Sequence, residues 1–138
     1  MFTKITHITL FVHDQDAALN FYKKLGFAVH TDAHFGTLRW LTVHLAEQAD
    51  VELALVLADS PEEKALVGKQ AATKPLLSLE TTDCMKDYEK LVADGVECTE
   101  KPAAQPWGTS AAFKDLYGNI IYVCQPCLID VSRFSGVL

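Results

Sequence analysis

The first half of the chain places ionisable and aromatic side chains on strand-like stretches, where they could act on a bound molecule. His7, His44 and Glu52 carry the imidazole and carboxylate groups that bind divalent metals or transfer protons. Trp40 carries a ring that can stack on an aromatic or cationic molecule. Glu52 stands between two aliphatic residues, and a buried carboxylate deprived of its partner costs ~3–5 kcal/mol. We therefore expect Glu52 to meet a cation, a histidine or water.

Three further aromatic residues are candidates for a ligand-binding surface. Phe11 lies on the first strand-like stretch, Trp107 in a Pro-Trp-Gly turn, and Tyr122 on the last stretch, where a buried phenol needs a hydrogen-bond partner. All these candidates also have a purely structural explanation, as core aromatic residues or hydrogen-bonded histidines. Surface or turn positions are expected for the remaining histidines, His13, His30 and His34.

Alternation along the strands sorts their side chains onto two faces. One face is apolar and is expected to pack under a helix: Ile8, Leu10, Val12, Leu41, Val43, Leu45, Val51, Leu53, Leu55 and Leu57. The opposite face holds His7, Thr9, Phe11, Trp40, Thr42, His44, Glu52, Ala54 and Val56. A small-molecule site needs apolar walls with a few polar groups, so the second face is the predicted binding surface.

The order of strands and helices occurs twice in the chain. A strand at 5–12 precedes a helix at 15–25, which Asp14 caps and Gly26 ends. Asp83 and Gly95 stand 69 positions further on, after a strand at 76–81. Three strand-like stretches follow each helix: 27–32, 37–46 and 50–57, then 96–101, 109–115 and 119–125. The sequence therefore predicts an α+β fold of two tandem βαβββ modules.

A single domain, residues 1–138, is expected to contain both modules. Module one covers 1–59, a charged connector with room for one helical turn covers 60–73, module two covers 74–128, and a C-terminal tail covers 129–138. No apolar run approaches the ~18 residues of a membrane span, and the N-terminus lacks a signal-peptide pattern. We expect a cytoplasmic protein that binds no membrane.

Charge and cysteine content disfavour other partners. A net charge of −6 without a basic cluster argues against nucleic acid and fits a neutral or cationic small molecule. The four cysteines are expected to be reduced thiols. Cys124 and Cys127 have the C-x-x-C spacing of redox and zinc motifs, but the pair ends a strand instead of opening a helix, and no second pair follows.

Two stretches carry a resemblance to a known superfamily. The opening ITHITLFVHDQDAALNFYKKLGF and the closing PWGTSAAFKDLYGNIIYV resemble the two ends of the glyoxalase/bleomycin-resistance/extradiol-dioxygenase (vicinal oxygen chelate) superfamily. Leu116 and Tyr117 replace the Pro-x that the family has after Asp115. The resemblance implies a cupped, partly closed mixed sheet with the helices on the outside. It also implies modules paired within one chain or swapped between two, and open sheet edges favour a homodimer.

The resemblance further implies a metal site, which this sequence fills only in part. The ligand positions of the family's metal enzymes correspond to His7, Glu52, Leu76 and Tyr122. Leucine and tyrosine are not usual ligands, whereas a catalytic zinc takes about three protein ligands. His44 or Glu80 could be recruited, because strand alternation puts them on the same face. We expect no bound metal and no other cofactor.

Two functions remain open. The leading hypothesis is a glyoxalase/bleomycin-resistance-like protein that binds a small aromatic or cationic molecule in a sheet-lined cavity, without a metal. The residues expected to contact that molecule are His7, Phe11, Trp40, Glu52, Trp107 and Tyr122. The alternative is a metal-dependent lyase, isomerase or dioxygenase of the same superfamily.

Overall fold

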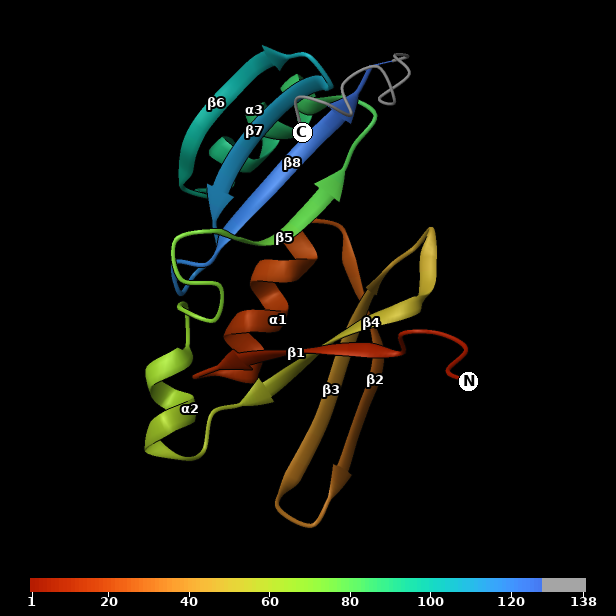
Figure 1. Cartoon of the computed structure of the whole chain (residues 1–138). Coiled ribbons are helices and arrows are strands. Elements are labelled where there is room, and N and C mark those ends of the chain that lie inside the picture. The colour runs from red at the N-terminus through yellow and green to blue at the C-terminus, as the bar shows by residue number, and fades with distance from the viewer. Residues whose placement is uncertain (128–138) are drawn as a thin grey trace. The chain divides into compact units, whose positions relative to one another are not determined.

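A computed structural model of the protein describes residues 1–127 and divides into two compact units (Figure 1). The first unit contains Met1–Ala72 and Leu116–Asn119, and the second contains Thr73–Asp115 and, among the described residues that follow Asn119, positions 120–127. The predicted tail at 129–138, and residue 128 of the second module, lie outside the described residues.

Four strands and two helices form the first unit. They are β1 (His7–Val12), α1 (Gln15–Lys24), β2 (Phe27–Phe35), β3 (Leu38–Leu45), β4 (Gln48–Leu57) and α2 (Pro61–Leu66). The strands form one sheet in the order β1-β4-β3-β2, in which β1 runs parallel to β4 and the other pairs are antiparallel. Helix α1 packs against β2 and β4. The helical turn predicted in the connector is α2.

The second unit repeats this topology. Its elements are β5 (Pro75–Glu80), α3 (Cys84–Ala93), β6 (Cys98–Gln105), β7 (Gly108–Lys114) and β8 (Ile120–Pro126). The strand order is β5-β8-β7-β6, with β5 parallel to β8, and α3 packs against β6, β7 and β8 (Figure 1). The predicted α+β fold of two βαβββ modules is confirmed. Hydrogen bonds join the strands in two four-stranded sheets, one in each module, and neither sheet closes.

The same local signals start and end the two longer helices. Asp14 and Asp83 are the N-caps, and each side chain accepts the backbone N–H three residues ahead, at 2.9 Å and 3.0 Å. Gly26 (φ +96°) and Gly95 (φ +83°) follow the helix ends in the left-handed region, which glycine adopts without strain. None of the helices within residues 1–127 combines the length and the hydropathy needed to cross a bilayer.

The predicted apolar face is the core of the first unit. The sheet residues predicted for this face that are buried are Leu10, Val12, Leu41, Val43, Leu53 and Leu55, and the buried residues of α1 are Ala18, Leu19, Phe21 and Tyr22. The ends of the predicted rows are not covered, since Ile8 is 46% exposed and Leu57 is 50% exposed. Because α1 covers this face, the face that carries the candidate site residues is the other one.

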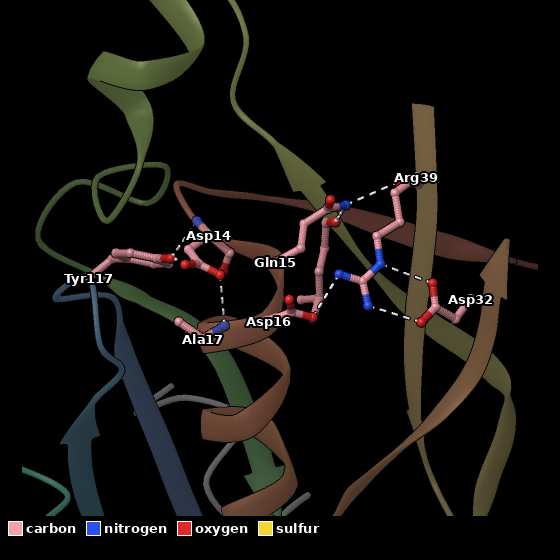
Figure 2. A network of polar contacts seen from close by, with 8 residues as sticks. Asp14, Gln15, Asp16, Ala17, Asp32, Arg39 and Tyr117 are labelled. Carbon is pink, nitrogen blue, oxygen red and sulfur yellow. Dashed lines mark hydrogen bonds and ion pairs between the residues drawn. The ribbon is translucent and has the colours of Figure 1, made fainter. Parts of the chain in front are cut away.

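Arg39 ties the start of α1 to the sheet (Figure 2). Its guanidinium donates two hydrogen bonds of 2.9 Å to Asp32 and one of 2.7 Å to Asp16. The side chain of Gln15 donates to the carbonyls of Arg39 at 3.1 Å and Leu55 at 2.9 Å. Hydrogen bonding to Arg39 lowers the pKa of the Asp32 carboxyl, and Asp32, then Asp16, raise the pKa of Arg39. The network therefore holds α1 on the apolar face.

Replacement of Arg39 by glutamine is expected to lower the stability of the folded protein at neutral pH. It should also make that stability change less as the pH is lowered. The pKa of Asp32 in the folded protein lies below the ordinary value of 3.8, so the ion pair with Arg39 contributes its full stabilisation above pH 3.8. This stabilisation is lost as the pH falls through the pKa that Asp32 has in the folded protein, because the carboxylate is then protonated. The melting temperatures of wild type and Arg39→Gln should thus differ most near about pH 6 and converge as the pH falls well below the ordinary Asp value of 3.8.

Circular dichroism melts across this pH range measure the effect. Lys4→Gln, which removes an exposed positive charge on the same unit, is the control and should track the wild type. A difference between wild type and Arg39→Gln that stays constant with pH would contradict the role given to Asp32.

Candidate functional site

Strands β1 and β4 bring His7 and Glu52 side by side. The parallel register pairs the two residues directly, so both side chains leave the same face of the sheet. The ring of His7 meets the ring of Trp40 on β3 edge-on, with centroids 5.2 Å apart and an interplanar angle of 81°. His7 is exposed, and Trp40 is half-buried. Phe11 lies further along β1, paired with Val56 and half-buried.

The carboxylate of Glu52 is held at one of its two oxygens. Thr42 Oγ1 donates to Oε1 at 2.7 Å, and His30 Nδ1 lies 3.0 Å from the same oxygen. Thr42 is fully buried, whereas the side chains of Glu52 and His30 are 19% and 40% exposed. Because a carboxylate oxygen only accepts, Nδ1 of His30 must carry the proton. The histidine partner expected for Glu52 is thus His30.

Irregular strand pairing explains why alternation along β2 did not predict His30 as the partner of Glu52. Val29 pairs with Val43 and Thr31 pairs with Thr42, so His30 is an extra residue in β2, a β-bulge. The pairing of β3 with β4 also shifts register, between Val43, which pairs with Leu53, and Leu45, which pairs with Gln48. The rings of His30 and His44 lie 5.4 Å apart, nearly perpendicular. A bulge breaks strict alternation, and nothing in the local sequence of β2 marks its position.

In the second unit, Trp107 and Tyr122 form a polar aromatic pair. The indole Nε1–H of Trp107 donates to the hydroxyl oxygen of Tyr122 at 2.8 Å, so the phenol has the partner that its position requires. Tyr122 pairs with Ser78 on β5 and with Ala112 on β7. Trp107 is 37% exposed and leaves part of its ring open to contact. The prediction that these residues share one cavity with those of the first unit stays a prediction.

The residues at the implied metal positions do not form a ligand set. Leu76 has no donor atom, and the hydroxyl of Tyr122 already accepts a hydrogen bond. Of the two possible recruits, His44 uses Nδ1 to donate to the carbonyl of Leu45 at 2.9 Å, and Glu80 is exposed on β5. Within residues 1–127, no group of three or more His, Cys, Asp or Glu side chains lies close enough together to hold a metal ion.

All four cysteines, which lie in the second unit, are free thiols. Burial raises the pKa of Cys84, Cys98 and Cys124, and Cys127 is exposed at the end of β8. A thiol with a raised pKa contains little of the reactive thiolate at neutral pH. Cys124 therefore lacks the activation that a redox C-x-x-C motif needs.

Ellman's reagent at about pH 7.5 should modify one thiol of the native protein quickly and three slowly, because reactivity follows exposure and thiolate content. The fast thiol is expected to be Cys127, so Cys127→Ser should lose the fast phase. Fast modification of both Cys124 and Cys127 in the native state would restore the redox interpretation.

Glu52→Ala is expected to destabilise the protein more than Glu52→Gln, by about 1–3 kcal/mol, because alanine leaves the buried hydroxyl of Thr42 without an acceptor. Glutamine retains an acceptor oxygen and removes only the charge. Urea unfolding of the two variants measures the difference. Equal stability of the two would show that the hydrogen bond between Thr42 and Glu52 contributes nothing.

The amino-acid sequence matches a known family and individual relatives. The family model described as the Glyoxalase/Bleomycin resistance protein/Dioxygenase superfamily matches residues 4–123. A protein of Shewanella frigidimarina (strain NCIMB 400), described only as uncharacterized, is 38% identical over 119 residues, which cover 84% of this chain and 88% of that protein.

Solved structures share the fold. UcmS2 superimposes with a TM-score of 0.78 at 33% identity, covering 90% of this chain and 98% of the other. TnmS3 from Streptomyces sp. CB03234, described as an antibiotic binding protein, gives a TM-score of 0.74 at 31% identity, covering 91% and 98%. This chain therefore has the same fold as a protein described as an antibiotic binding protein.

Proposed function

Because the chain belongs to the glyoxalase/bleomycin resistance protein/dioxygenase superfamily, we propose that it binds a small aromatic or cationic molecule without breaking a bond. The observation that carries this proposal is the Glu52 carboxylate, whose second oxygen makes no hydrogen bond or ion pair within residues 1–127. The carboxylate lies on a sheet face that also presents the rings of His7 and Trp40. The similarity to TnmS3, an antibiotic binding protein, supports the same class of function.

Each residue of the first unit has a distinct part in the proposed binding. The second carboxylate oxygen of Glu52 would pair with a cationic or N–H group of the ligand. Trp40 would attract the same positive charge through its ring, as indoles attract cations, and Phe11 would add apolar surface. His7 is exposed beside Glu52 and Trp40, and it would donate a hydrogen bond to the ligand or accept one from it. In the second unit, the open part of the Trp107 ring and the Tyr122 hydroxyl remain proposed ligand contacts.

A metal-dependent lyase, isomerase or dioxygenase is the second candidate. It is favoured by the direct pairing of His7 and Glu52, which occupy two of the implied ligand positions. A metal held there would polarise a substrate oxygen. The remaining implied positions do not fit, because Leu76 offers no donor and Tyr122 is engaged with Trp107. We therefore derive no catalytic step from this pair.

We also propose that the protein forms a homodimer and that it is located in the cytoplasm. Strands β1 and β2 are the edges of one sheet, and β5 and β6 are the edges of the other. Unpaired edge strands commonly find cover in a second chain. Four free thiols suit a reducing compartment.

A thermal-shift screen of small aromatic cations should find compounds that raise the melting temperature, because a ligand selective for the folded state at a hundredfold excess over Kd adds ~2.7 kcal/mol. A bound compound should also quench tryptophan fluorescence, and Trp40→Phe should lose part of that quenching. Glu52→Gln should bind the same cations more weakly. Compounds that stabilise the protein equally in wild type and Glu52→Gln would place the site elsewhere.

Metal analysis of the same preparations separates the two candidates. Less than one equivalent of zinc, nickel, manganese or iron after desalting is expected for a binding protein. A stoichiometric metal that is lost in both His7→Ala and Glu52→Gln would instead favour the enzyme.

A further inference from the structure

The side chain of Gln70 occupies the outer edge of β1. Its Oε1 accepts the backbone N–H of Phe11 at 2.8 Å, and its Nε2 donates to the backbone carbonyl of Thr9 at 3.1 Å. Strand β1 is an edge of the first sheet, with β4 as its neighbour on the other side. A further strand would offer the same kind of acceptor and donor to this edge. The amide of Gln70 therefore takes the place of a strand along Thr9 and Phe11.

The loop that carries Gln70 is also held from a second side. Gly68 has φ +77°, and a Cβ added there would collide with the backbone carbonyl oxygen of Tyr117, so only glycine allows this close approach. The hydroxyl of Tyr117 in turn hydrogen-bonds to the backbone of Asp14, just beyond the end of β1. The loop that presents Gln70 to β1 therefore has a defined shape, set by its contact with the segment around Tyr117.

Building on the function proposed above, we propose that Gln70 is a positioning residue, which holds Phe11 on the binding face for the ligand. Phe11 is half-buried and lies on an edge strand, which a neighbouring strand anchors on one side only. Gln70 supplies the second anchor at the backbone N–H of Phe11 itself. A ring that is already fixed loses less conformational freedom on binding, so the anchor raises the affinity for an aromatic molecule.

Hydrogen exchange of single amides, followed by NMR, reports the anchor directly. Gln70→Met fills a similar space but makes neither hydrogen bond, so the amide of Phe11 should exchange about tenfold faster relative to that of Leu10. Leu10 is the internal reference, because its backbone faces β4, as the carbonyls of Thr6 and Val12 do, and reports the stability of the sheet. An unchanged ratio of the two exchange rates would overturn the role of Gln70.

Calorimetric titration of the full-length protein with N-methylquinolinium, an aromatic cation, tests the effect on binding. Gln70→Met should weaken binding about fivefold, and Phe11→Leu should weaken it as well. The variant with both substitutions should bind no more weakly than Phe11→Leu alone, because Gln70 acts through the Phe11 ring. A general structural role would instead give two independent losses that add. Gln48→Met, at the exposed start of β4, is the matched control and should bind as wild type does.

A second variant and the folding of each protein complete the test. Gln70→Asn is too short by one methylene to reach both backbone groups and should reproduce the loss of Gln70→Met, and thermal melts verify folding. If the probe binds wild type and both Gln70 variants equally, the function stands and the role of Gln70 is overturned. Additive losses in the double variant overturn that role as well. If the probe does not bind wild type, the proposed function falls for aromatic cations, and the role of Gln70 in binding falls with it.

Discussion

The parallel pairing of β1 with β4 constrains the rest of the first unit. Two parallel strands cannot be joined by a tight turn, so the chain between them must cross over the sheet. Here α1, β2 and β3 make that connection, and α1 covers one face of the sheet. The same pairing sets His7 against Glu52 in register. A shift of one residue would turn one of these two side chains toward the core.

Much of this arrangement could be predicted from the sequence, because it follows from alternation and helix caps. The two modules, the caps Asp14 and Asp83, and the apolar rows under α1 were all visible as patterns. The partner of Glu52 was not, because a bulge adds a residue to β2 and breaks the alternation on which the prediction relied. Arg39 was missed for a different reason. Its three hydrogen bonds join residues from a helix and two strands, and sequence spacing does not specify such contacts.

The two units share a topology but differ in the chemistry of corresponding positions. Glu52 of the first unit pairs with His7 and contacts His30, and the corresponding part of the second unit presents Tyr122, hydrogen-bonded to Trp107. A duplicated fold needs only its apolar rows, caps and helix ends to be repeated. The polar residues on the opposite faces do not belong to this repeated set, and the two units differ there.

The first unit is not a continuous stretch of chain, since Leu116–Asn119 belongs to it. The hydroxyl of Tyr117 accepts the backbone N–H of Asp14 at 3.0 Å and donates to the carbonyl of the same residue at 3.2 Å, and the Tyr117 ring contacts His13 edge-on. These contacts reach the residue that caps α1. During synthesis, the N-terminal half therefore leaves the ribosome well before the segment that completes it. Its last stabilising contacts form only after residue 119 has emerged, so the order of translation delays the final packing of the half that is made first.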